Sequence, residues 1–155
     1  MSTRSLTMVV DRSAAEDNEL GFACNPSILS DKSYVNMYLH HDGYPEYQGV
    51  QLAKWAEYMQ EEKGFNNFGD GSRIASHLAY DFHYPSQYLY ADVGDIDHAY
   101  TYILWTGKSN IWISCFSQYN SKNIFVLPIK KVIDKYASNS FEYTDWNYKA
   151  NTNQK

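Results

Sequence analysis

Cysteine is scarce in this chain. Cys24 and Cys115 are the only two among 155 residues, and they form no CxxC pair. This excludes a disulfide framework and a zinc site built on paired cysteines. A chain of this length can bury a core without such staples, and isolated thiols are typical of a reducing compartment. We therefore expect a cytoplasmic protein with a single domain over residues 1–155.

Long apolar runs are missing as well. No segment approaches the roughly 18 consecutive apolar residues that cross a bilayer. Residues 1–10 have no apolar core followed by a small-residue cleavage site, so we expect no signal peptide there. We expect no membrane partner.

Positive charge is in deficit. The 13 Lys and Arg against 18 Asp and Glu give a formal net charge of −5. A general nucleic-acid binder needs surplus basic residues that neutralise phosphates and release counterions. Long nucleic acid is therefore not the expected partner.

Aromatic residues are abundant, with 15 Tyr, 7 Phe and 4 Trp. Many of the tyrosines lie on or beside predicted strands, which is compatible with an aromatic core. Tyrosine also supplies rigid contact area with a polar tip, which suits protein interfaces and base stacking. Together with the negative charge, this favours a protein or a small nucleotide-like ligand as partner, and a homo-oligomer is compatible with it.

The first half of the chain predicts two strands and two helices. Residues 5–11 are β-branched and apolar on both sides, which predicts a central strand, whereas residues 12–33 show no period and form an irregular excursion. Residues 34–40 alternate and predict a half-buried strand. Apolar residues at helical spacing predict a helix over residues 50–62. A second helix is expected from Ser72, which would cap it, to Phe82.

The second half predicts mainly sheet. Strands are expected at residues 87–91, 99–105, 110–117 and 123–127, followed by a short helix over 129–136 and a polar tail over 138–155. The whole pattern predicts an α+β fold, with a mainly antiparallel sheet of about five to six strands. Two helices should pack on one face, with a short C-terminal helix beside them.

The most informative motif is the turn His40-His41-Asp42-Gly43-Tyr44-Pro45. Asp-Gly is a turn signal, and Pro45 forces the residue before it out of the helical region. The end of a strand beside a helix N-terminus can bind a ligand through free N–H groups, which makes His40, His41, Asp42, Tyr44 and Tyr47 candidate binding residues. The alternative is a structural corner in which Asp42 bonds the backbone while Tyr44 and Pro45 fill the core.

Two further hypotheses concern metal and phosphate. His40, Asp42, Asp81 and His83 have the ligand types of a divalent-metal hydrolase, although no zinc-type spacing is present. Gly69, Gly71 and Ser72 lie before a helix and could hold a phosphate through backbone N–H groups, but the motif is too short for a nucleotide-binding fingerprint. No catalytic nucleophile is identified, and no cofactor is expected.

Three segments, at residues 3–7, 38–45 and 69–71, resemble a family of small, mostly uncharacterised proteins of bacteriophages and bacteria. Its members open with Thr-Arg-x-Leu-Thr and have an Asp-Gly-Tyr-Pro turn before a helix. The resemblance covers roughly residues 2–10 and 34–103. Relatives often have Gly and His where this chain has Tyr47 and Gln48. The resemblance implies a viral or mobile-element setting rather than a mechanism.

From these observations we expect a binding protein rather than an enzyme. The favoured hypothesis is a phage-encoded accessory factor that acts in the host cytoplasm, either by inhibiting a host protein or by sequestering a defence signal. The alternatives are a metal-dependent phosphoester hydrolase acting on a nucleotide, and a structural virion component.

Overall fold

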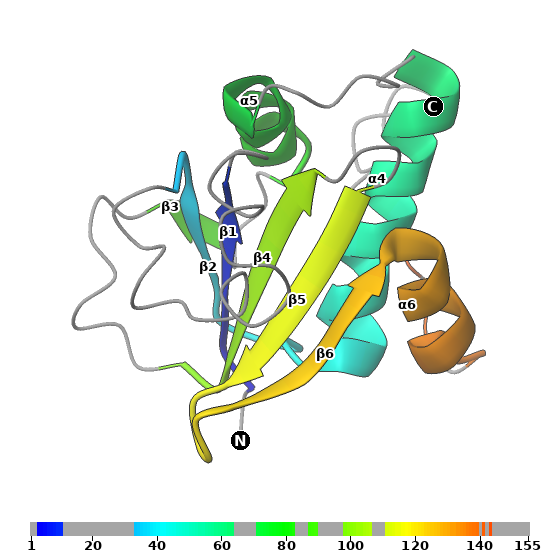
Figure 1. Cartoon of the computed structure of the whole chain (residues 1–155). Coiled ribbons are helices and arrows are strands. Elements are labelled where there is room, and N and C mark those ends of the chain that lie inside the picture. Colours follow the sequence, from blue (N-terminus) through cyan, green and yellow to red (C-terminus); the bar gives the residue numbers. More distant parts are fainter. Residues whose placement is uncertain are drawn as a thin grey trace.

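One six-stranded sheet organises the chain, in the strand order β3-β2-β1-β4-β5-β6 (Figure 1). The computed structural model describes residues 3–10, 33–63, 71–82, 87–89, 98–106, 111–139, 141 and 143. Its strands are β1 (Ser5–Val9), β2 (Asn36–Leu39), β3 (Gln87–Leu89), β4 (Tyr100–Thr106), β5 (Ile111–Ser117) and β6 (Lys122–Pro128). Its helical segments are the π-helical turn η2 (Pro45–Gly49) and the helices α4 (Val50–Lys63), α5 (Gly71–Asp81) and α6 (Ile129–Tyr136).

The sheet is mixed. Neighbouring strands pair antiparallel except for β1 and β4, which are parallel. Parallel neighbours need a long crossover connection, and here α4 and α5 lie between the two strands in the chain. The predicted α+β class and strand number are confirmed, with this parallel pair as the one difference in sheet type.

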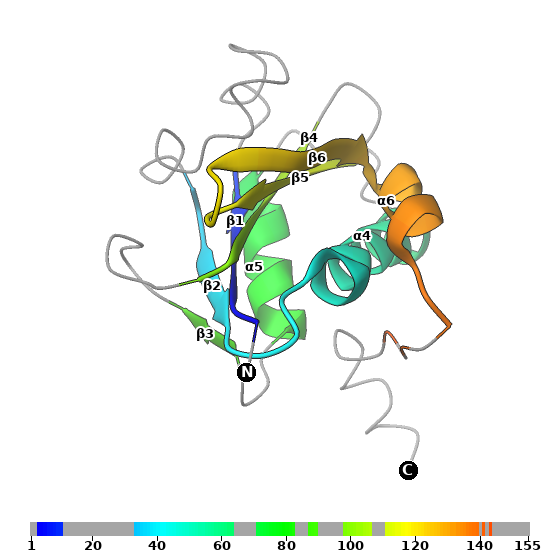
Figure 2. The same ribbon diagram turned by 90° about the horizontal axis from the view of Figure 1, so that it is seen from below.

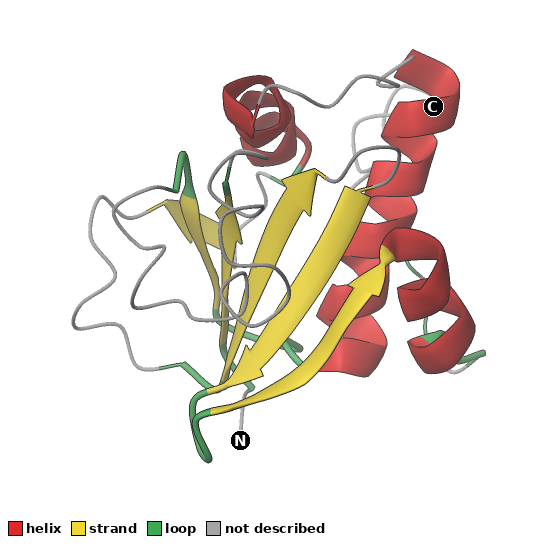
Figure 3. Ribbon diagram, in the orientation of Figure 1, coloured by secondary structure: helices red, strands yellow, loops and turns green. Residues whose placement is uncertain are grey.

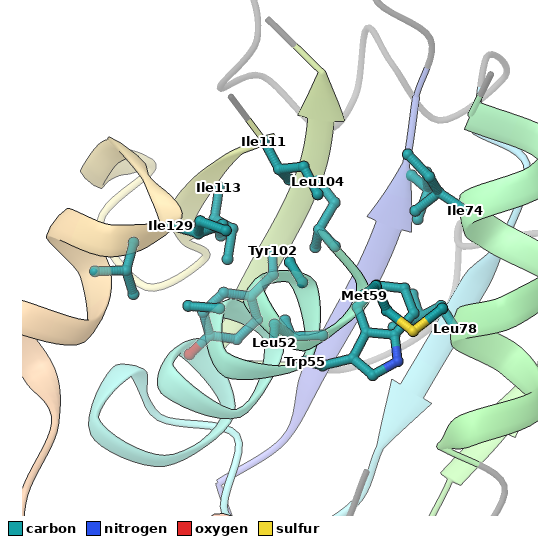
Figure 4. Close-up of a cluster of buried hydrophobic side chains, with 14 of the residues drawn as sticks. Leu52, Trp55, Met59, Ile74, Leu78, Tyr102, Leu104, Ile111, Ile113 and Ile129 are labelled. Atoms are coloured by element: carbon teal, nitrogen blue, oxygen red, sulfur yellow. The ribbon is translucent and has the colours of Figure 1, made fainter. Parts of the chain in front are cut away.

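Three helices cover the same face of the sheet, as the view from below shows (Figure 2). The secondary-structure colouring shows α5, α4 and α6 beside that sheet (Figure 3). Their apolar side chains meet inward-facing strand residues in one buried cluster, part of which appears in Figure 4. The largest buried members include Trp55, Tyr102, Phe82, Leu52, Met59 and Leu78. We call this side of the sheet the helical face.

The opposite face of the sheet has its own buried cluster. It consists of Leu6, Met8, Val10, Tyr38, Ile103 and Trp105. Trp105 stacks on Trp112 with ring centroids 5.2 Å apart, and its indole N–H donates to the Ser114 hydroxyl at 3.0 Å. Strand β1 is therefore buried on both faces, as predicted for a central strand, although Ser5 and Thr7 are polar.

Most element positions agree with the sequence predictions, and α6 agrees at both ends. Strand β2 was expected to have one solvated side, which is wrong: all four of its residues are buried, because Tyr38 joins the second cluster. Ser72 was expected to cap α5, but the helix begins at Gly71 and Ser72 lies within its first turn. The predicted features at residues 12–32 and 144–155 fall outside the described residues.

Within the described ranges, no helix is long and apolar enough to cross a membrane.

Candidate functional site

The turn between β2 and η2 is organised by Gly43. Asp42 has a positive φ of 57°, and the next N–H, that of Gly43, donates to the Thr3 carbonyl at 2.9 Å. A Cβ atom at Gly43 would lie 2.6 Å from the Cβ of Ser5 and 2.9 Å from its backbone nitrogen. Only glycine fits at this close approach of the turn to β1.

Tyr102 of β4 forms a hydrogen bond that stabilises the same turn. Its hydroxyl donates to the Gly43 carbonyl at 2.6 Å, in a fully buried contact. Burial is the main reason why the pKa of Tyr102 is raised well above its usual 10.0. The hydroxyl therefore keeps its proton, and its role as a donor, throughout the neutral pH range.

Pro45 starts the helical segment. Tyr44 is extended, with φ −74° and ψ 160°, as expected for a residue that precedes proline. Its carbonyl accepts the N–H groups of Tyr47 at 3.0 Å and Gln48 at 2.9 Å. A Cβ atom at Gly49 would lie 3.4 Å from the Tyr102 ring, so the π-helical turn packs directly on β4. Gly43 and Pro45 thus form a structural corner.

The histidines lie on the exposed side of this corner. The His40 ring nitrogen Nδ1 is 2.9 Å from the Tyr38 hydroxyl, and the His40 and His41 rings meet edge to face at 4.5 Å. Their contact is possible because β2 ends at Leu39, so the strand alternation that would separate them has stopped. On the other side, Tyr38 contacts Tyr88 of β3 at 6.1 Å between ring centroids.

These contacts form a continuous series, which we call the aromatic row: Tyr88, Tyr38, His40 and His41. Tyr38 is buried, whereas Tyr88 is 50% exposed and His41 is exposed. Asp42, also exposed, follows His41 at the end of the row. The row is therefore buried at Tyr38 and accessible at its two ends, Tyr88 and His41.

Tyr44 and Tyr47 lie in a different environment. Their rings contact Phe141 at 5.8 and 5.4 Å, and Tyr47 also contacts Tyr143 at 5.9 Å. The Tyr143 hydroxyl donates to the Glu46 carbonyl at 2.7 Å. Two of the predicted binding residues are thus partly covered by residues of the same chain. The sequence offers only one signal for this contact, the aromatic residues in an otherwise polar tail.

Burial and the neighbouring Asp42 carboxylate raise the pKa of Tyr44 above 10.0. The Tyr44 hydroxyl points to that carboxylate at a long distance of 3.5 Å. A neutral phenol beside Asp42 is a hydrogen-bond donor rather than a base at neutral pH.

Four buried side chains on the helical face have no hydrogen-bond partner for their polar atoms among the described residues. We call them the polar quartet: Ser5, Thr7, Gln48 and Gln51. Each is 0% exposed. Leaving such an atom unpaired costs about 1–3 kcal/mol, and native proteins have only a few of them. Sequence reasoning missed this set, although Gln48 and Gln51 precede the core residues Leu52 and Trp55 by one helical turn.

The structure does not bring the proposed metal ligands together. The Asp81 carboxylate accepts the Trp55 indole N–H at 2.7 Å, and Trp55 belongs to the core of the helical face. His40 is bonded instead to Tyr38, a residue of the opposite face. His83 lies outside the described residues. Across the described part of the chain, no group of three or more His, Cys, Asp or Glu could hold a metal ion.

The predicted phosphate site is only partly described. Gly69 lies outside the described residues, Gly71 is buried at the start of α5, and Ser72 is exposed beside it. These residues and the aromatic row belong to separate parts of the fold. Helix α5 packs on the helical face, whereas Tyr38, the buried member of the row, belongs to the cluster on the opposite face.

No protein-family model, curated protein or solved structure matches this chain. Two sets of side chains are the candidates for a function: the exposed aromatic row and the buried polar quartet. Rings with polar tips are suited to binding a surface, whereas enclosed amides and hydroxyls are suited to hydrogen bonding.

Proposed function

We propose that this chain is a phage-encoded accessory factor that binds and inhibits a host protein in the bacterial cytoplasm, with the aromatic row as its contact surface. The observation that supports the proposal is the uninterrupted series of ring contacts that runs from Tyr88 to His41. The phage setting follows from the family resemblance of the sequence. The binding role follows from the physical character of the row.

Side chains of this kind supply much of the affinity in protein interfaces. Tyrosine rings bury large areas at a low cost in conformational entropy, and the tyrosine hydroxyl and the histidine ring nitrogens can form hydrogen bonds with a partner. The hydrogen bond between Tyr38 and His40 holds both rings in place before a partner arrives, which lowers the cost of ordering them on binding. A protein partner also suits the net charge of −5, which disfavours long nucleic acid.

Quantitative affinity capture from host lysate tests the proposal. The double variant His41→Ala, Tyr88→Ala removes the two accessible ends of the row and keeps the buried Tyr38. We expect at least a tenfold loss of the protein captured by the wild type, because truncation of the hot-spot residues of an interface costs about 2 kcal/mol or more.

A matched control is Tyr119→Ala. Tyr119 is 83% exposed and lies between β5 and β6, far from β3 in the strand order. Capture should be unchanged in this variant. Equal loss in both variants, or equal retention in both, would contradict the assignment of the contact surface to the aromatic row. Direct binding of the purified host protein to the two variants completes the test.

A further inference from the structure

The sheet has two edge strands, β3 and β6, one at each end of the strand order. An edge strand has a row of backbone N–H and C=O groups that pairs with no strand of its own sheet, and this row can pair with a strand of another chain. Natural proteins prevent such pairing with charged side chains, proline and β-bulges at the edge. The two edges of this sheet differ in these features.

Strand β6 has all three of the protective features. It begins at the exposed Lys122 and ends at Pro128, which has no N–H to donate. Its register with β5 shifts between Cys115 and Phe116, and an irregularity of this kind bends an edge away from a flat partner. The β6 edge is therefore protected against the addition of a strand.

The three residues of strand β3 have none of these features. Gln87, Tyr88 and Leu89 include no charged residue and no proline, and they pair with β2 in an unbroken register. Both views of the fold show β3 as the outermost strand on its side of the sheet (Figures 1 and 2). The β3 edge therefore lacks the features that prevent strand addition.

Two large side chains of β3 are exposed. Tyr88 is 50% exposed and Leu89 is 62% exposed, and as adjacent strand residues they lie on opposite faces. Tyr88 contacts Tyr38 on the face opposite to the helices, whereas Leu89 pairs with Met37, a core residue of the helical face. An added strand would bring cross-strand neighbours to within about 4.5–5.5 Å of both side chains.

We propose that β3 is a self-association surface, at which the β3 strands of two copies of this chain pair antiparallel and join their sheets edge to edge. Two features favour a second copy as the occupant. The strand is uncharged, so two chains of net charge −5 can meet there without like charges in direct contact. The β3 strand of a second copy is also already ordered, whereas a disordered peptide would have to be ordered by a ladder of only three residues.

The proposed contact has a twofold axis, because the same strand pairs with itself. The central residue, Tyr88, then becomes the cross-strand neighbour of its counterpart in the second copy, and the two aromatic rows meet on one face of the joined sheet. Edge pairing adds no layer over that face, so His41 stays accessible. This inference does not depend on the binding of a host protein, and it can fail or succeed separately from the proposed function.

Sedimentation equilibrium of the full chain over a range of concentrations tests the proposal. We expect the average mass to rise from that of one chain to that of two and no further, because a twofold contact closes on itself. Hydrogen exchange of the wild type locates the contact. At least one backbone N–H of residues 87–89 should exchange roughly threefold more slowly, or slower still, in concentrated than in dilute solution, because pairing protects it.

Leu89→Lys gives the β3 edge the charge that protects β6. It should raise the Kd of the dimer by roughly tenfold or more and leave the urea midpoint unchanged, since the side chain is exposed. The matched control is Ile124→Lys in the other edge strand, where the side chain is 38% exposed. It changes the net charge by the same amount, and its dimer should have a Kd within about twofold of the wild type.

Each of three results would overturn the proposal. One is a wild-type chain that stays single, with unchanged exchange at residues 87–89, up to its solubility limit. Another is a Leu89→Lys variant that forms the dimer as the wild type does. The last is a single wild-type chain whose capture of a host protein is lost in Leu89→Lys, which would assign the β3 edge to a strand of another protein.

Discussion

The two halves of the turn between β2 and η2 have opposite environments although they are adjacent in sequence. His40 is half-buried, and His41 and Asp42 are exposed. Gly43 and Pro45 are buried, and Gly43 is in contact with β1 and β4. The buried half is determined by sterics and hydrogen bonding, whereas the accessible half carries the residues that we propose bind a partner. Substitutions in the two halves should therefore affect different measurements.

The largest effect on stability is expected for Gly43→Ala. The new methyl group would overlap the backbone and Cβ of Ser5, and overpacking of this kind costs about 1–3 kcal/mol, occasionally more. The free energy of unfolding, measured in urea, should fall by an amount at the upper end of that range. Gly49→Ala is the control, since its methyl group would meet the Tyr102 ring at an ordinary 3.4 Å. A tolerated Gly43→Ala would contradict the close contact.

The next largest loss of stability is expected for Tyr102→Phe. It leaves the buried Gly43 carbonyl without its hydroxyl donor, at a cost of about 1–2 kcal/mol near neutral pH. Urea unfolding of the variant beside the wild type measures this difference. An unchanged midpoint would show that the hydroxyl contributes nothing to the turn.

The same variant has a pH signature. The pKa of Tyr102 is raised in the folded chain. The stability that its protonated hydroxyl contributes is therefore fully present below 10.0, the pKa of the residue in the unfolded chain, and is lost as the pH rises above that value. The wild type should therefore lose up to about 1.4 kcal/mol more per pH unit than Tyr102→Phe in that range. Tyr44, Tyr100 and Tyr136 also have raised pKa values, but they are common to both proteins and cancel in the difference.

For Asp42→Gly we expect a gain in stability, smaller than the losses predicted above. Asp42 has a φ of 57°, a left-handed conformation that glycine adopts without steric cost. The variant should be more stable by about 0.5–1 kcal/mol, less the entropy that glycine gains in the unfolded chain. Thermal unfolding measures the difference, and Asp42→Ala, which keeps the steric conflict, serves as the comparison. A stabilised Asp42→Ala would show that backbone conformation is not the cause.

The smallest effect on stability is expected for His41→Ala, which should stay within about 0.5 kcal/mol of the wild type because the side chain is exposed. Its effect should appear in partner capture instead. Chemical denaturation and capture, measured on the same preparation, separate the two roles. Loss of stability beyond that limit would place His41 in the structural half of the turn.

Much of this fold follows from local patterns in the sequence. The apolar run before Val10 indicates a strand buried on both sides, the spacing of Leu52, Trp55 and Met59 indicates a helix, and Asp-Gly followed by Pro45 indicates the corner. Each of these signals depends on residues a few positions apart, so no tertiary information is needed. The candidate site was less predictable, because its members come from distant segments. Tyr88 of β3 contacts Tyr38 of β2, which in turn contacts His40. Phe141, in the predicted tail, contacts Tyr47.

The sequence by itself determined the α+β class, the order of the elements and the position of the turn, because periodicity and turn chemistry are local properties of the chain. Only the tertiary structure decided that β1 and β4 are parallel, that Tyr38 is buried and that Gly43 lies too close to Ser5 for any side chain. It also decided that the polar atoms of Ser5, Thr7, Gln48 and Gln51 are buried without hydrogen-bond partners. Strand pairing and burial depend on which distant segments meet. A polar residue in an apolar run does not reveal whether its hydrogen bonds will be made.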